Sequence, residues 1–220
     1  MSEEIQQVPN ALLGVDVSHY QAVIDWPCVS EAGVKFAWIK ATDGLVADPM
    51  LKTNIEGAYG AGIPFGFYHF WRPQHDAKEQ ADNFMHSIID ATAQTTAASV
   101  WPEFAHALDI ETGTLPEERQ EQALAWLTHI DGTSPKQTKP LVYVSPSYAQ
   151  INLTDSAWLE YPLWVAHYTE NPKPNTDKWP TWMFWQRQGN ARIGGISTPV
   201  DVDWYNGSAE DFQKLIQLPT

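Results

Sequence analysis

Eight short runs of apolar, β-forming residues constrain the fold of this chain most strongly. They alternate along 220 residues with segments of helical character. Most of the runs are apolar throughout instead of alternating with polar residues, which is typical of strands buried on both faces of a parallel sheet. The strands expected from this pattern are Leu13–Val17, Phe36–Ala41, Pro64–Phe70, Ala105–Ile110, Leu141–Ser145, Leu163–His167, Met183–Gln186 and Val200–Trp204.

Four segments between these runs carry helix signals. Met50–Ala61 ends before Gly62-Ile-Pro, which stops a helix, and Asp76–Ile89 repeats apolar residues at spacings of three and four. Thr114–Ile130 begins with a capping threonine, a proline and two acids, and Ser208–Ile216 begins with a capping serine. These four segments are expected to be helices.

This alternation predicts one α/β domain, a single irregular (β/α) barrel of the TIM-barrel type. The connections 168–182 and 187–199 are too short for full helices, so helices are expected to be missing or shortened in the C-terminal half. We expect residues 1–10 to form a flexible N-terminal arm and residues 11–220 to form the catalytic barrel.

Composition excludes several classes of function. The 27 acidic and 13 basic side chains give a formal net charge of −14, which argues against nucleic-acid binding and against docking on an anionic membrane. No apolar stretch is long enough for a membrane span, so no membrane insertion is expected. The single cysteine excludes a Cys-rich zinc site, and the seven histidines lack the spacing of a catalytic zinc site. Neither a metal nor a cofactor is therefore expected.

Aromatic residues are unusually frequent, with 11 Trp, 8 Tyr and 8 Phe. One core has little use for so many tryptophans, so we expect several of these rings to line a ligand surface. Sugar rings are the commonest flat partner of such a surface.

Polar and aromatic side chains gather where the expected strands end. In a parallel barrel the chemistry is located at the carboxyl ends of the strands, so we expect these side chains to surround a cleft. Lys40 is expected there as a charge partner for acidic groups. The candidate site residues at the strand ends are Asp16, Tyr68, His69, Asp109, Glu111, Tyr143, His167, Tyr168, Trp185, Gln186, Asp201 and Asp203.

Asp109-Ile110-Glu111 is the most informative of these positions. Residues two apart on a strand face the same side, about 6.5–7 Å apart at the backbone. Two carboxyl groups so placed resist ionising together, so one is pushed towards its protonated form. A proton donor beside an anion is what cleavage of a glycosidic bond requires. The alternative is that one acid caps a helix and the other makes a structural hydrogen bond. For His69 and His167 the alternatives are a hydrogen bond to carboxylates or substrate and a buried core histidine.

Ordered motifs extend over nearly the whole chain, from about Leu13 to Gly207. They are Gly14-Val-Asp-Val-Ser-His-Tyr20, Phe36-Ala-Trp-Ile-Lys-Ala-Thr-Asp-Gly44, Ala61-Gly-Ile-Pro-Phe-Gly-Phe-Tyr-His-Phe70, Leu108-Asp-Ile-Glu111, Leu163-Trp-Val-Ala-His-Tyr168, Phe184-Trp-Gln186 and Val200-Asp-Val-Asp-Trp-Tyr205. Together they resemble the family 25 glycoside hydrolases, the lysozymes (N-acetylmuramidases) found in bacteria, phages and fungi.

The resemblance implies a modified (β/α) barrel that hydrolyses the β-1,4 bond between N-acetylmuramic acid and N-acetylglucosamine. The glycan strands of peptidoglycan would be its partner. Glu111 matches the general acid, and Asp109 matches a carboxylate that acts as nucleophile or orients the substrate's acetamido group. Asp16 and Asp201 match two further acids of the cleft.

The same resemblance assigns sugar-binding roles to Tyr68, Tyr143, Trp164, Tyr168 and Gln186. The strand-end pattern adds four further candidates for sugar binding, namely His69, His167, Trp185 and Asp203. The chain departs from the family pattern at three places, with Asp43 where Glu is common, Tyr20 where Trp is common and Asp203 where Asn is frequent. These departures concern subsite preference, because none of them touches the acid pair.

Two other functions stay open on the sequence: an inactive sugar-binding barrel, and a related chitinase-like glycosidase. The chain begins with acidic and polar residues where a Sec signal would be basic and then apolar. We therefore expect synthesis in the cytoplasm and action on the cell wall after holin-type release or delivery by a dedicated secretion system. Delivery machinery or an inhibitor (immunity) protein would then be a further partner, and we expect a monomer.

Overall fold

A closed barrel of eight strands forms the centre of the molecule. The computed structural model describes residues 5–95, 105–133 and 139–216. The barrel closes because β1 pairs with β2 on one side and with β9 on the other, and the two-residue strand β3 (Val46–Ala47) adds to β2. The barrel strands are β1 (Leu12–Val17), β2 (Phe36–Asp43), β4 (Phe65–Phe70), β5 (His106–Asp109), β6 (Leu141–Val144), β7 (Leu163–Ala166), β8 (Phe184–Ala191) and β9 (Val200–Tyr205).

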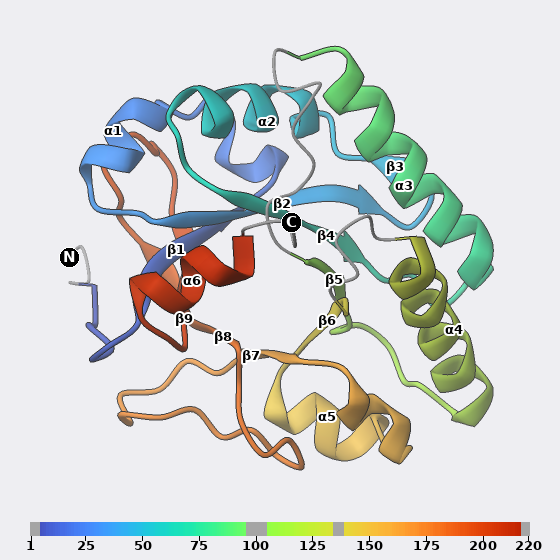
Figure 1. Cartoon of the computed structure of the whole chain (residues 1–220). Coiled ribbons are helices and arrows are strands. Elements are labelled where there is room, and N and C mark those ends of the chain that lie inside the picture. The colour runs from blue at the N-terminus through green and yellow to red at the C-terminus, as the bar shows by residue number, and fades with distance from the viewer. Residues whose placement is uncertain (1–4, 96–104, 134–138, 217–220) are drawn as a thin grey trace.

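Helices surround this barrel unevenly. Figure 1 shows α1 to α5 around the strands, whereas loops take the place of helices beside β8 and β9. Fewer and shorter helices in the C-terminal half were expected from the short connections there, and this prediction is confirmed. The helices are α1 (Trp26–Glu31), α2 (Leu51–Gly60), α3 (Ala77–Ala93), α4 (Glu117–Thr133), α5 (Pro146–Asn152) and α6 (Ala209–Ile216), with short 3-10 helices at His19–Gln21 and Ser156–Glu160.

One strand runs against the expected direction. β9 is antiparallel to both of its neighbours, β1 and β8, whereas the apolar runs suggested a parallel sheet throughout. The physical reason lies in the β8–β9 connection, residues 192–199, because a parallel crossover needs about a dozen residues or more. A shorter connection can only return the chain antiparallel beside the strand it leaves.

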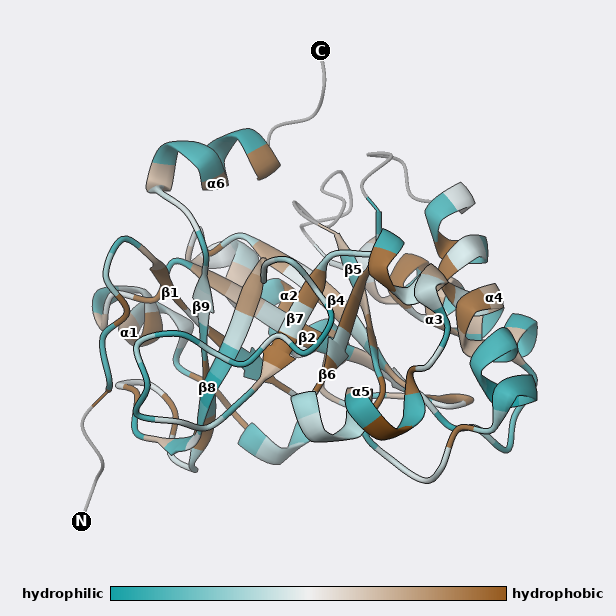
Figure 2. Cartoon of the chain, turned by 90° about the horizontal axis from the view of Figure 1, so that it is seen from below, coloured by the Kyte–Doolittle hydropathy of each residue, from teal (hydrophilic) through white to brown (hydrophobic). Residues whose placement is uncertain are grey.

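Two apolar layers hold the fold together. The outer layer lies between the barrel and its helices, and the inner layer fills the barrel with large rings. In the inner layer Trp38 stacks on Trp164, with ring centroids 4.7 Å apart. Phe212 of α6 packs against Phe36 and Tyr205, so α6 closes the end of the barrel where β2 begins. Figure 2 shows α6 lying off this end, which leaves the opposite end for a cleft.

The tryptophans are mostly core residues, contrary to the expectation that several line a ligand surface. Trp38, Trp71, Trp126, Trp158, Trp164, Trp185 and Trp204 are among the largest fully buried side chains. They are needed because the inner and outer layers of a barrel are both filled with side chains.

Residues 5–10 pack against the barrel, although a flexible arm was expected over residues 1–10. Val8 is buried in the outer layer, the Gln6 amide donates to Gln188 Oε1 at 3.0 Å, and the Arg187 guanidinium donates to the carbonyl of Gln7. Residues 1–4 lie outside the described residues. In the described part of the chain, no helix is both long and apolar enough to cross a membrane.

Candidate active site

A cleft opens at the carboxyl ends of the parallel strands, with a cavity of about 240 Å³. Nine of the residues predicted from the sequence line it. The predicted residues in its lining are Asp16, Tyr68, Asp109, Glu111, Tyr143, Trp164, Tyr168, Gln186 and Asp201. Eight of the twelve strand-end candidates thus lie together in this cleft, along with Trp164, which the family resemblance supplied.

Asp109 and Glu111 face the cleft from the end of β5. Asp109 is the last residue of the strand and only 6 % exposed, whereas Glu111 is exposed. Ile110 lies between them and packs into the outer layer, and its amide still bonds to the carbonyl of Tyr143 on β6. Strand-like pairing with β6 thus extends one residue past the end of β5, and both carboxyl groups line the same cavity.

Both members of this acid pair hold their protons more strongly than usual. Burial raises the pKa of Asp109 well above its ordinary value, and the charge of Glu111 raises it further. One Asp109 oxygen is buried without a hydrogen-bond partner among the described residues. Partial desolvation of the Glu111 carboxyl group by the walls of the cleft also raises its pKa, while the positive charges of Lys40 and Arg72 oppose that rise. The raised pKa values favour protonation of at least one of the two carboxyl groups over two full charges.

Gln186 on β8 connects the tyrosines of the cleft to Asp16. Its Oε1 accepts hydrogen bonds from the hydroxyls of Tyr143 and Tyr168, at 2.8 and 2.7 Å. Its Nε2 donates to Asp16 Oδ2 at 2.8 Å. Because the oxygen is occupied by two donors and the nitrogen by an acceptor, the amide has one favourable orientation.

The pairing of β1 with β9 brings two further carboxyl groups, those of Asp16 and Asp201, to the wall of the cleft. Asp16 on β1 lies directly opposite Asp201 on β9. Burial and the charges of Asp16 and Glu111 raise the pKa of Asp201 to about 8. Asp203 is fully buried beneath this wall, where it accepts a hydrogen bond from Trp164 Nε1, and it does not line the cleft.

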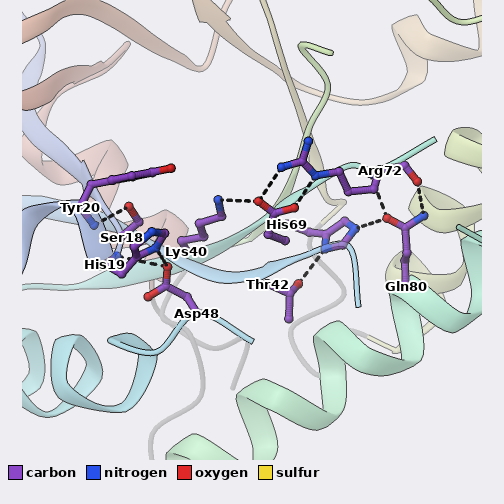
Figure 3. A network of polar contacts seen from close by, with 10 residues as sticks. Ser18, His19, Tyr20, Lys40, Thr42, Asp48, His69, Arg72 and Gln80 are labelled. Atoms are coloured by element: carbon purple, nitrogen blue, oxygen red, sulfur yellow. Dashed lines mark hydrogen bonds and ion pairs between the residues drawn. The ribbon is translucent and has the colours of Figure 1, made fainter. Parts of the chain in front are cut away.

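Two predicted substrate-binding residues, His69 and Trp185, lie outside the cleft. Each is fully buried and adjoins a cleft residue in sequence, so strand alternation turns it to the helix side of the barrel. His69 bonds to Thr42 and Gln80 (Figure 3) and stacks on a tryptophan of α4. Burial lowers its pKa to about 3, so the ring is neutral. The indole of Trp185 donates to the carbonyl of His167.

His167 lines a second cavity of about 460 Å³, where its Nδ1 accepts a hydrogen bond from the Asn175 amide. Glu111, Tyr143 and Tyr168 line both cavities, so the two form a continuous cleft with Glu111 at their junction. The further polar residues of the second cavity are Ser145, Ser147, Gln150 and Asn175.

Four lining residues were not among the candidate site residues, although Tyr20 was named as a departure from the family pattern, and Lys40 was expected only as a charge partner. All five lie within or just after the first three barrel strands: three follow β1, one lies within β2 and one ends β4. They are Ser18, Tyr20, Gln21, Lys40 and Phe70. Tyr20 is 72 % exposed at the cleft.

Lys40 is the only Lys or Arg in the lining of either cavity among the described residues. Its ammonium lies 3.4 Å from Asp43, which also receives two hydrogen bonds from Arg72. Lys40 and Arg72 both lie over the ring of Phe70, at 4.7 and 4.4 Å from its centroid. Figure 3 shows this side of the cleft, with Lys40 and Arg72 pointing towards each other. This arrangement holds the Lys40 ammonium beside the carboxyl groups that line the cleft.

Among residues 5–95, 105–133 and 139–216, no group of three or more His, Cys, Asp or Glu side chains is arranged to hold a metal ion. The chemistry of the described cleft is that of carboxyl groups, tyrosine hydroxyls, an amide and one ammonium.

Known proteins share both the sequence pattern and the fold. The family model "Glycosyl hydrolases family 25" matches residues 15–196. Lysozyme M1 of Streptomyces globisporus is 32 % identical over 206 residues, which cover 89 % of this chain and 68 % of that protein. The uncharacterised protein YegX of Escherichia coli (strain K12) is 32 % identical over 211 residues, which cover 92 % of this chain and 72 % of that protein.

Solved structures agree. The bacterial lysozyme from Streptomyces coelicolor superposes with a TM-score of 0.73 at 30 % identity, covering 94 % of this chain and 98 % of the other. A family 25 glycosyl hydrolase from Bacillus anthracis has a TM-score of 0.79 at 22 % identity, covers 98 % of this chain and 97 % of the other, and supports the fold alone. The chain is therefore a glycoside hydrolase of the lysozyme type and belongs to glycosyl hydrolase family 25.

Proposed function

We propose that this chain hydrolyses the glycan strands of peptidoglycan at the β-1,4 bond between N-acetylmuramic acid and N-acetylglucosamine. The position of Glu111 carries the proposal, because this residue lines both cavities of the cleft and has Asp109 beside it in the first. A glycosidic oxygen joins two sugar rings, so a general acid has to lie where the two ring sites meet. The kinship with lysozymes supports this substrate.

Glu111 acts as the general acid and then as the general base. Its side chain is exposed to solvent, so a glycan bound in the cleft would bury it and raise its pKa further. The protonated carboxyl group donates its proton to the glycosidic oxygen as the bond to the anomeric carbon breaks. The resulting carboxylate then takes a proton from the water that attacks the same carbon.

Asp109 supplies the second carboxylate. It either attacks the anomeric carbon or orients the substrate's 2-acetamido oxygen to do so, and both routes retain the anomeric configuration. Its buried oxygen without a hydrogen-bond partner, among the described residues, is free to meet the reacting centre. The positive charge that develops at the anomeric carbon favours ionised Asp109, whose pKa burial otherwise raises.

The remaining cleft residues hold the acids and the sugar. Asp16 and Asp201 flank the acid pair, and Tyr68, Tyr143, Tyr168 and Gln186 offer hydrogen-bonding groups to the sugar. His167 would contact the sugar in the second cavity. Tyr168 is 59 % exposed and offers a ring face for stacking, whereas Trp164 is almost fully buried.

The cell wall is the proposed place of action. Relatives include the autolytic lysozyme of Clostridium acetobutylicum, at 29 % identity over 88 % of this chain and 55 % of that protein. The release route, an inhibitor partner and the monomeric state stay predictions from the sequence. The intact acid pair argues against an inactive sugar-binding barrel.

Product analysis tests the proposed bond. Purified peptidoglycan and, separately, chitin are digested, the products are reduced with borohydride, and their masses are measured. We expect muropeptides that end in reduced N-acetylmuramic acid, and little release from chitin. Products ending in reduced N-acetylglucosamine, or equal cleavage of chitin, would contradict the assignment. Binding to peptidoglycan without any product would favour the sugar-binding module instead.

A further inference from the structure

Tyr20 is an aromatic residue of the cleft that the proposed mechanism does not use. It lines the first cavity, the one of about 240 Å³ that Asp109 also lines. Its side chain is 72 % exposed, whereas Tyr68 and Tyr143 in the wall of the same cavity are buried. Most of the Tyr20 ring therefore projects from the rim of the first cavity into solvent.

Hydrogen bonds hold the backbone of Tyr20 in one place. Tyr20 belongs to the 3-10 helix His19–Gln21, and its amide donates to Ser18 Oγ at 3.3 Å. The Ser18 amide donates to Gln21 Oε1 at 2.9 Å, and Gln21 Nε2 donates to the carbonyl of Pro199 at 3.3 Å. These bonds tie the 3-10 helix to the segment that leads into β9, so the rim of the cavity at Tyr20 is a fixed part of the barrel.

His19 supports the Tyr20 ring. The two ring centroids lie 4.1 Å apart, with 34° between the ring planes. Buried Asp48 holds the imidazole, because its Oδ2 lies 2.7 Å from His19 Nδ1 and accepts from the His19 amide at 3.1 Å. Figure 3 shows these bonds beside Tyr20. The Tyr20 ring thus has support on one side and most of its surface open, which suits stacking against a flat ligand.

We infer that Tyr20 forms a further sugar subsite, in which its ring stacks on the N-acetylglucosamine unit that precedes the N-acetylmuramic acid of the cleaved bond. His19 is the positioning residue of this subsite, since it supports the ring and does not itself line the cleft. The inference rests on the proposed function, which sets the direction of the glycan strand in the cleft.

The lining of the two cavities identifies the sugar. In the proposed reaction the anomeric carbon lies beside Asp109, which lines only the first cavity, so N-acetylmuramic acid occupies that cavity and the leaving N-acetylglucosamine the second. The first cavity is smaller than the about 300–1,000 Å³ of pockets for drug-sized ligands, so it suits a single sugar ring. Tyr20 lines the first cavity and not the second, so a ring stacked on it belongs to the non-reducing side of the strand. Because the two sugars alternate, that ring is N-acetylglucosamine.

Two peptide-free glycan fragments test the subsite. One is the tetrasaccharide that begins with N-acetylglucosamine, and the other is the trisaccharide that lacks this first sugar. In both, sulfur replaces the oxygen of the bond to be cleaved, so that they stay intact during calorimetric titration. We expect the wild type to bind the tetrasaccharide about tenfold more tightly than the trisaccharide, and this ratio to fall to about one in Tyr20→Ala. Tyr20→Phe keeps the ring and should keep the ratio, as should the matched control Tyr59→Ala, an exposed tyrosine on α2.

The ratio also tests His19, because His19→Ala should lower it to a value between those of the wild type and Tyr20→Ala. A fall in both affinities with an unchanged ratio would mean that His19 is merely structural. Fragments that bind Tyr20→Ala with the wild-type ratio would overturn the subsite and leave the proposed function intact. A wild-type ratio near one would do the same even if the variants fail to fold. Failure of the wild type to bind either fragment would overturn the proposed function and the subsite with it.

Discussion

At the scale of single residues, strand alternation decides which predicted residues reach the cleft. Tyr68 and Gln186 face it, while their sequence neighbours His69 and Trp185 turn to the helix side. The same rule brings Asp109 and Glu111 together and sends Ile110 outward. The sequence analysis grouped all polar and aromatic residues at a strand end, which does not distinguish neighbours that face opposite sides. Assigning alternate residues to opposite faces of each strand would have distinguished them.

Lys40 is the one Lys or Arg in the described lining of the cleft, and its positive charge opposes the charges of the cleft acids. Its ammonium lowers the pKa of both Asp109 and Glu111. In Lys40→Met both carboxyl groups should keep their protons to higher pH, so both limbs of the kcat/KM profile should move up by about one unit. Arg72 remains bonded to Asp43 in this variant, so the loop beside the cleft keeps its support.

The matched control for Lys40→Met is Lys78→Met, which removes a positive charge from an exposed position on α3. Its pH profile should follow that of the wild type. Limbs that stay in place in Lys40→Met would show that Lys40 does not set the protonation of the acid pair.

At the scale of elements, local signals predict helices well and strand direction poorly. Asp76 caps α3 through the amides of Lys78 and Glu79, and this signal is visible in the sequence. The direction of β9 depends on a partner strand and on the length of the 192–199 connection, which an apolar run does not encode. The short helix α5 was missed, although Ser145 caps it and Pro146 begins it.

The tryptophan surplus shows a limit of composition. Trp164 is the one tryptophan that lines the cleft among the described residues, and it is buried against Trp38. Tyrosines provide most of the aromatic lining instead, namely Tyr20, Tyr68, Tyr143 and Tyr168. Composition signals that large rings are needed but cannot assign them to a core or to a ligand, because both environments favour aromatic residues.

At the scale of the whole molecule, the acidic cleft makes stability depend on pH. The pKa of Asp201 is raised from 3.8 to about 8, so the folded protein binds more protons than the unfolded chain between these values. Its stability therefore falls as pH rises through this range. Buried His69 and His106, with pKa values lowered to about 3 and about 4, cost stability only as pH falls below about 6.5.

Thermal unfolding above neutral pH separates the effect of Asp201 on stability from that of the two buried histidines, which acts only below about pH 6.5. We expect the Tm to be lower at pH 8.5 than at pH 7, and the decrease to be smaller in Asp201→Asn. The control Asp155→Asn changes an exposed acid and should keep the wild-type decrease. A Tm that stays level or rises over this interval would contradict the raised pKa of Asp201.

The most direct test of the account is the turnover of Glu111→Gln on purified peptidoglycan, measured beside Glu118→Gln, whose acid is exposed in the first turn of α4. The glutamine keeps the size of the side chain but cannot donate or take the catalytic proton. We predict that Glu111→Gln loses about a hundredfold or more in kcat while it still binds the glycan and folds as the wild type does. We predict that Glu118→Gln keeps wild-type turnover. Wild-type-like turnover in Glu111→Gln would contradict the assignment of the general acid.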